Sequence, residues 1–133
     1  DLVTAMNTDT KSFQKIIEAV FNYWVSPECD IGGIQSWADY SGGVVSAFEG
    51  AMASAKSGTD TAIFTSGGTI ATMVGHVLKL TSDRVYEFYE PVFNCSITRI
   101  IFNSRKCSLS TFNDVGHLHL MSAQLQERLV TYR

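Results

Sequence analysis

The stretch Thr61-Ala-Ile-Phe-Thr-Ser-Gly-Gly-Thr-Ile-Ala71 decides the expected fold. Its short apolar run stops at turn residues, as a buried parallel strand does. Gly67 and Gly68 permit a tight turn and a close approach of the backbone. Apolar residues then recur at helical spacing from Thr69 to Leu80. The stretch therefore predicts a strand over 61–66, a glycine turn and a helix.

A strand that enters a helix in this way leaves free backbone N–H groups, and the positive end of the helix dipole, at the edge of a sheet. Such a place binds anions, often phosphate. We therefore expect a phosphate site at Thr65, Ser66, Gly67 and Gly68. The glycine pair could equally serve only to turn the chain, because short motifs often occur without function.

Composition limits the classes of function. The 133 residues are enough for one domain or part of one, and 45% hydrophobic residues predict a packed core. A net charge of −3, with no basic run longer than Arg105-Lys106, argues against nucleic acid and against an anionic membrane as partners. No signal peptide and no apolar run of membrane-spanning length is found. The chain does not begin with Met, which is expected of a fragment or of a processed product, and its length leads us to expect a single, partial domain over residues 1–133.

The three cysteines lie far apart, and their number is odd. This argues against a disulfide framework and favours a reducing compartment, so we expect a cytoplasmic protein. No basic neighbour lowers the pKa of a thiol, so Cys29, Cys95 and Cys107 are expected to be small buried hydrophobes.

Periodicity, caps and turn residues predict the other elements. Ser36 followed by Asp39 is a variant of the capping box, at the start of the second helix. The expected helices cover Thr10–Val25, Trp37 to about Lys56, Ser82 to about Glu90, and 122–129; a hairpin pairs 95–102 with 107–112. Three strands make a small sheet for this many helices. We therefore expect an α/β fold in which a neighbouring strand is missing from the chain or supplied by a partner.

Three motifs in order carry a resemblance to a known family. They are Thr65-Ser66-Gly67-Gly68-Thr69-Ile70, Asn94-Cys-Ser96-Ile-Thr98 and Asn113-Asp114-Val-Gly-His117-Leu118. Residues 34–118 resemble the second half of the histidine phosphatase superfamily, the phosphoglycerate mutase-like enzymes. The resemblance implies the C-terminal portion of a three-layer α/β fold, incomplete here. It also implies a parent protein that hydrolyses a phosphate monoester or transfers its phosphoryl group, with no cofactor.

Two departures from the family pattern bear on activity. The family's phosphate-accepting His lies in an Arg-His-Gly motif on an N-terminal strand, and the 133 residues contain no such motif. Ser66 stands at the position of the family's second His. Its hydroxyl can donate one hydrogen bond to a phosphate oxygen, but it brings no positive charge. The resemblance therefore implies that Ser66 is what remains of the catalytic centre, and that this chain alone is inactive.

Two other functions remain open. The chain could be a non-enzymatic module that binds a phosphorylated ligand or a protein on the same fold. Its uncovered sheet edge would favour a homodimer. The turn from Ser66 to Ala71 is also similar to that of bacterial-type asparaginases, but their partner Asp and Lys motif is not found here.

The histidines are expected to be structural. His76 lies close to the apolar face of its helix, which predicts a position in the core or at its boundary. His117 and His119 could contact a metal, but the sequence places no third ligand beside them, so no metal site is expected.

Overall fold

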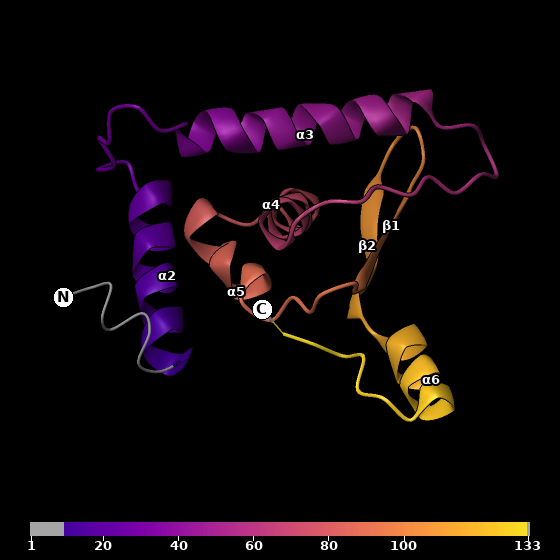
Figure 1. Ribbon diagram of the computed structural model, residues 1–133. Helices are drawn as coiled ribbons and strands as arrows, with labels where there is room; N and C mark the ends of the chain where they lie inside the picture. The colour runs from indigo at the N-terminus through magenta and orange to yellow at the C-terminus, as the bar shows by residue number, and fades with distance from the viewer. Residues whose placement is uncertain (1–9, 133) are drawn as a thin grey trace.

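The computed structural model describes residues 10–132, which form five α-helices, one 3₁₀ turn and one hairpin (Figure 1). In chain order these elements are α2 (Thr10–Val25), α3 (Trp37–Ser54), α4 (Gly67–Leu78), η1 (Ser82–Arg84), α5 (Tyr86–Tyr89), β1 (Ile97–Phe102), β2 (Cys107–Asp114) and α6 (Gly116–Leu125).

The first two helices confirm what the local sequence predicts. Helix α2 has the expected bounds. At the start of α3, the Ser36 hydroxyl accepts a hydrogen bond from Asp39 N at 3.1 Å and donates one to Asp39 Oδ2 at 2.8 Å. Helix α3 ends at Ser54, because Ala55 takes an extended conformation (φ −71°, ψ 138°).

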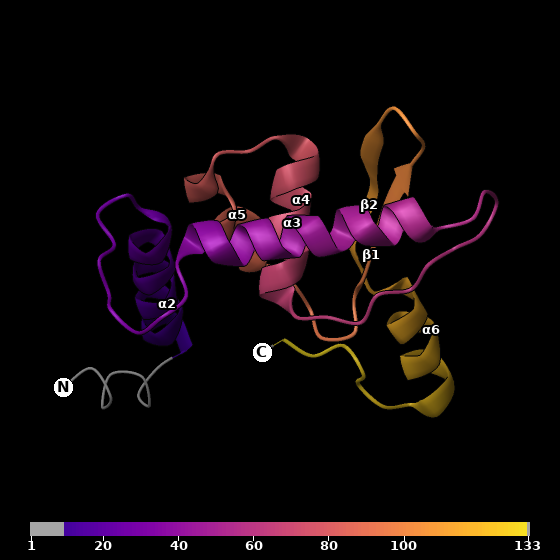
Figure 2. The same cartoon turned by 90° about the horizontal axis from the view of Figure 1, so that it is seen from above.

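Helix α4 lies at the centre of the molecule. Helix α3 crosses it, α2 lies beside one end of α3, and the hairpin lies near the other end (Figures 1 and 2). Five consecutive residues of α4, from Ala71 to Gly75, are buried. A Cβ on Gly75 would come within 2.9 Å of Val85 Cγ2, so only glycine permits this approach of α4 to the segment before α5. The described core is completed by Tyr86, Val92 and Leu118.

An aromatic cluster joins α2 to α3 and α5. The ring of Phe21 contacts those of Trp37, Tyr86 and Tyr89, with centroids 5.6, 5.4 and 5.9 Å apart. Trp24 packs against Trp37 with ring centroids 5.2 Å apart, and its Nε1 donates to a backbone oxygen in the loop before α3. Aromatic pairs of this kind contribute more to stability than their buried area alone would, so the cluster holds α2 in place.

The predicted hairpin is confirmed. Strands β1 and β2 are antiparallel, and the side-chain oxygen of Asn103 accepts hydrogen bonds from the amides of Arg105 and Lys106 to form the turn. Strand β1 begins only at Ile97, after the left-handed Cys95 (φ 56°). That cysteine is exposed rather than buried, while the other two are half-buried.

The last helix begins earlier than predicted. Helix α6 spans Gly116–Leu125 rather than 122–129. At its start the Asp114 side chain accepts a hydrogen bond from Gly116 N at 2.7 Å. At its end Gln126 takes the left-handed conformation, which stops the helix.

The predicted strand over 61–66 is not formed. Within residues 10–132 the sheet has two strands, β1 and β2, and residues 59–66 belong to no sheet. Ile63 is 58% exposed and Phe64 is 97% exposed. A strand exists through hydrogen bonds to a neighbouring strand, and the described residues supply none for this segment. The described part of the chain therefore has an incomplete α/β arrangement, in which the sheet consists of the hairpin alone.

Asn113 ties the hairpin to the segment after α5. Its amide donates to Pro91 O at 2.7 Å and accepts from Phe93 N at 2.9 Å. Its own backbone N–H donates to Thr98 Oγ1 at 3.2 Å, and its φ is 56°. Asparagine tolerates this left-handed conformation better than most residues do.

We predict that Asn113→Ala lowers the free energy of unfolding by about 2–3 kcal/mol, from two lost hydrogen bonds and a strained backbone. Asn113→Gly removes the same amide and relieves the backbone, so its loss should be about 1 kcal/mol smaller. Chemical denaturation measures both values. Equal stability of Asn113→Ala and the parent chain would contradict this role for the amide.

Burial raises the pKa of the Cys107 thiol above its ordinary value. The folded state therefore keeps the proton to higher pH, and its thiolate, the reactive form, is scarcer at a given pH. We predict that iodoacetamide at pH 8 alkylates Cys107 more slowly in the folded chain than in urea, as measured by peptide mass spectrometry. Because the pKa of the Cys107 thiol is higher in the folded than in the unfolded state, the protonated thiol favours folding at pH values below its unfolded pKa. This contribution to the stability of the fold is lost as the pH rises through the folded pKa. Equal rates in both states would contradict the shift.

Candidate functional site

The chain enters α4 near the place that the sequence predicts, but Gly67 and Gly68 are the first residues of the helix rather than a turn before it. Helix α4 begins at Gly67, two residues before the expected Thr69, and Ser66 is its N-cap with extended backbone angles (φ −87°, ψ 162°). Ser66 O accepts the first hydrogen bond of the helix from Ile70 N at 3.0 Å. The Ser66 side chain makes no capping hydrogen bond. The turn therefore presents the start of a twelve-residue helix with no side-chain cap.

The amides of the first turn of α4 are the donors of this site. Gly67, Gly68 and Thr69 precede the first residue whose N–H has an acceptor within the helix. The helix dipole adds partial positive charge at the same end. The turn can therefore donate hydrogen bonds to an anion, although no charged side chain contributes to it.

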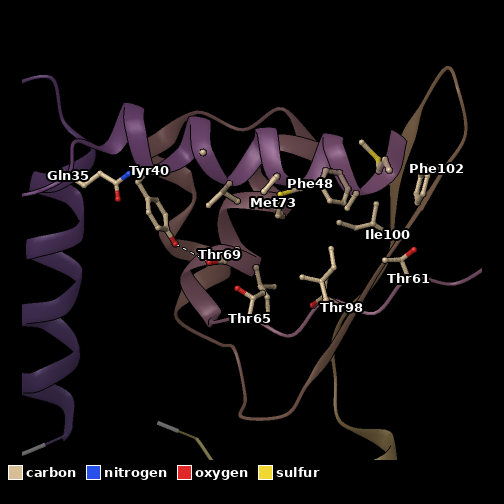
Figure 3. A pocket seen from close by; sticks show the side chains of 17 residues that line it. Gln35, Tyr40, Phe48, Thr61, Thr65, Thr69, Met73, Thr98, Ile100 and Phe102 are labelled. Carbon is tan, nitrogen blue, oxygen red and sulfur yellow. Dashed lines mark hydrogen bonds between the residues drawn. The ribbon is translucent and has the colours of Figure 1, made fainter. Parts of the chain in front are cut away.

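Three hydroxyl groups meet beside these amides. Ser66 Oγ lies 3.3 Å from Thr69 Oγ1. Thr69 Oγ1 in turn lies 3.3 Å from the Tyr40 hydroxyl (Figure 3). Either oxygen of each pair can donate. The spacing of Thr69 three residues after Ser66 was a signal in the sequence. Tyr40 could not be found in this way, because it comes from α3 and reaches the turn only through the packing of α3 on α4.

The glycine pair allows this close packing. A Cβ on Gly68 would lie 3.3 Å from the Tyr40 hydroxyl oxygen, which is tighter than an ordinary contact. A Cβ on Gly67 would lie 3.5 Å from Val92 Cγ1, an ordinary contact distance. Gly68 is thus the more constrained of the two, and neither glycine takes the left-handed conformation.

A cavity of about 550 Å³ opens next to the turn. Thr65 and Thr69 line it, whereas Ser66, Gly67 and Gly68 do not (Figure 3). Most of its wall is apolar and comes from α3, α4, β1 and the segment 61–65. None of the lining side chains carries a charge. Of the predicted site residues, Thr65 therefore lines the cavity, whereas Ser66 is exposed and lies outside its lining.

The other two motifs of the sequence lie together, and their contacts are structural. Thr98 and Asn113 are hydrogen-bonded to each other. The C-terminal tail holds Asn94. The backbone N–H of Asn94 donates to Thr131 O and its side-chain amide donates to Thr131 Oγ1, both at 3.1 Å. Ser96 Oγ is buried without a hydrogen-bond partner. These residues position the hairpin: their hydrogen bonds run to one another, to the segment 91–93 and to Thr131, not to the start of α4.

The histidines lie apart from the turn. His76 is exposed on α4, so the prediction of a core or boundary position is wrong: it falls just beyond the buried run Ala71–Gly75. His117 is half-buried and His119 is exposed. Within residues 10–132 no group of three His, Cys, Asp or Glu side chains is placed to hold a metal ion. No helix in this part of the chain is long and apolar enough to cross a membrane.

Comparison with known proteins identifies the family. The family model of the histidine phosphatase superfamily (branch 1) matches residues 6–115. The match begins well before residue 34, where the resemblance in the motifs began, and it takes in α2. No curated protein and no solved structure matches the chain. The helices and the two-stranded antiparallel sheet agree with an incomplete α/β phosphoglycerate mutase-like fold. The chain belongs to the histidine phosphatase superfamily.

Proposed function

We propose that this chain is the C-terminal part of a histidine phosphatase or phosphoglycerate mutase-like protein, a single partial domain that acts on phosphate monoesters only with the rest of that protein. The observation that carries the proposal is that Ser66 is the N-cap of α4, at the position where the resemblance in the motifs places the family's second His. The family match supports the parent activity, and the hydroxyl in place of an imidazole supports inactivity of the chain alone.

The chemistry of phosphoryl transfer supports inactivity. A covalent route needs a His nitrogen that attacks phosphorus. The chain has three histidines, and none belongs to an Arg-His-Gly motif or lies in the turn 65–68. Cations or preorganised hydrogen-bond donors must stabilise the negative charge on the oxygens of the transferred phosphoryl group. Loss of one such donor raises the activation barrier by about 3–4 kcal/mol. The turn keeps neutral donors only.

The same donors support binding of phosphate. The first-turn amides of α4 and the hydroxyls of Ser66 and Thr69 converge on one end of the helix. Thr65 adds a third polar side chain, at the cavity wall. We propose Thr65, Ser66, Gly67 and Gly68 as the phosphate-binding residues, and a phosphorylated small molecule as the partner.

A second candidate is a module that binds a phosphorylated ligand without chemistry. The chain of hydroxyls from Tyr40 through Thr69 to Ser66 favours it, because these groups can donate hydrogen bonds to an oxyanion while they include no imidazole or carboxylate to act as nucleophile or general base. Both candidates predict that the 133-residue chain binds phosphate without turnover. They differ in whether turnover occurs once an N-terminal half with the nucleophilic His is added.

We predict that the chain releases no phosphate from p-nitrophenyl phosphate above the buffer rate, and that Ser66→His alone does not restore release, since the nucleophile is still absent. Phosphate release measured over hours at high protein concentration tests this. Turnover by the parent chain that Ser66→Ala abolishes would contradict the proposed inactivity.

Inorganic phosphate is expected to shift the amide NMR signals of Gly67, Gly68 and Thr69. Ser66→Ala should weaken phosphate binding by about 2- to 12-fold, the worth of one hydrogen bond of about 0.5–1.5 kcal/mol. The matched control is Ser104→Ala in the exposed hairpin turn, which should leave the affinity unchanged. Shifts that avoid the first turn of α4 would contradict the proposed phosphate site.

A further inference from the structure

The chain turns back after α6 and crosses to the segment that follows α5. Helix α6 stops at Gln126, and residues 127–132, which we call the strap, run back toward the middle of the molecule (Figure 1). The strap is fixed at its start, because Leu129 N donates to Ser122 Oγ of α6 at 3.0 Å. It lies beyond residue 115, where the family match ends. The strap is therefore a feature of this chain outside the part that the family model matches.

Two residues of the strap hold the irregular segment after α5. Thr131 accepts hydrogen bonds from the backbone N–H and from the side-chain amide of Asn94, both at 3.1 Å. The Tyr132 hydroxyl donates to Glu90 O. The ring of Tyr132 packs edge-on against that of Phe93, with centroids 5.8 Å apart. The strap thus contacts both ends of this segment.

Residues 90–94 form no helix or strand, so more distant groups must satisfy much of their backbone hydrogen bonding. Asn113 supplies two partners, since its amide accepts from Phe93 N and donates to Pro91 O. The strap supplies two more through the bonds that it makes to the backbone at each end of the segment. The path of residues 90–94 therefore depends on the strap as well as on the hairpin.

The same segment forms a wall beside the start of α4. Val92 is buried, and its Cγ1 lies 3.5 Å from the place that a Cβ on Gly67 would take. The ring of Tyr89, directly before the segment, lies 3.8 Å from that place and 3.9 Å from the corresponding place on Gly68. The first two residues of α4 therefore pack on side chains whose position the strap helps to fix.

We infer that the strap is a clamp on the start of α4: docked, it holds residues 90–94 against Gly67 and Gly68, and its release loosens the first turn of the helix. The strap can open, because its side-chain bonds to residues 90–94 are exposed and water competes for them. Docking also orders the six residues of the strap, which costs conformational entropy. Segments held in this way open locally while the rest of a protein stays folded.

The clamp bears on phosphate through the amides of the first turn. That consequence rests on the proposed function, whereas the effect of the strap on the order of α4 does not. Phosphate that binds these amides favours the docked strap, because the coupling of two events in one protein is reciprocal.

The test follows hydrogen exchange of single amides by NMR in the full chain. The Asn94 N–H reports on the strap, which supplies its acceptor. The Ile70 N–H reports on the first turn of α4, since its acceptor is Ser66 O. The Leu80 N–H reports on the far end of α4, since its acceptor is Gly75 O. Loosening of the first turn alone therefore differs from a general loss of stability.

The double variant Thr131→Val, Tyr132→Ala removes two hydrogen bonds and a ring contact from exposed residues. We expect exchange at Asn94 to become about fivefold faster or more, as the loss of two hydrogen bonds implies. Exchange at Ile70 should become about twofold faster or more through the coupling, with Leu80 unchanged. The matched control is Arg128→Ala, exposed in the same strap, which should change none of these rates.

Inorganic phosphate supplies the reverse experiment. Saturating phosphate should slow exchange at Asn94 in the parent chain, and the double variant should bind phosphate about twofold more weakly or worse. Phosphate binding by the parent chain that leaves Asn94 unchanged would overturn the coupling. A parent chain that binds no phosphate but shows the expected exchange pattern would contradict the proposed function and leave the clamp standing.

Three exchange results in the double variant would overturn the inference. Unchanged exchange at Asn94 would mean that the strap does not hold residues 90–94. Faster exchange at Asn94 with an unchanged rate at Ile70 would mean that the strap is docked without acting on α4. An equal rise at Ile70 and Leu80 would mean that the substitutions lower the stability of the whole fold.

Discussion

The burial of helix α4 is the constraint on which the rest of the described structure depends. Its residues Ala71–Gly75 are enclosed by α3, α5 and β2, and Gly75 has no side chain because Val85 occupies the space that a Cβ would need. The first residues of α4, Gly67 to Ile70, lie directly before this buried run. The position of the Ser66 hydroxyl and of the first-turn amides is therefore set by this packing together with the contacts that Gly68 and Thr69 make with Tyr40.

The dependence of a strand on a neighbouring strand explains why residues 61–66 join no sheet in the described part of the chain. A helix can be stabilised by its own hydrogen bonds and one apolar face, as α2 and α3 are. A strand has no internal hydrogen bonds and depends on a neighbour. The hairpin supplies its own neighbour through the Asn103 turn, so β1 and β2 form. Residues 61–66 lead into α4 with no such neighbour, and Phe64 remains almost fully exposed.

In the proposed phosphate site the hydrogen-bond donors are neutral, and none of them is a charged side chain. Amide donors come from the backbone, and they persist as long as the helix persists. Hydroxyls of Ser66, Thr69 and Tyr40 add neutral donors around them. Cations and a nucleophile must come from side chains, and the turn and the cavity carry none of these. The proposal therefore assigns phosphate binding to groups that remain, mainly backbone amides, whereas catalysis would need charged side chains that the turn and the cavity lack.

Local signals in the sequence determined α2, the Ser36 cap of α3, the hairpin, and the place of the turn at 65–68, because each depends on residues within a few positions of one another. The sequence by itself could not determine that 61–66 would lack a partner, that His76 would be exposed, or that Tyr40 would reach Thr69. Those features depend on which distant surfaces meet. Only the tertiary structure decided them, since strand pairing, burial and contacts between helices are properties of pairs of segments, whereas caps and turns are properties of one segment.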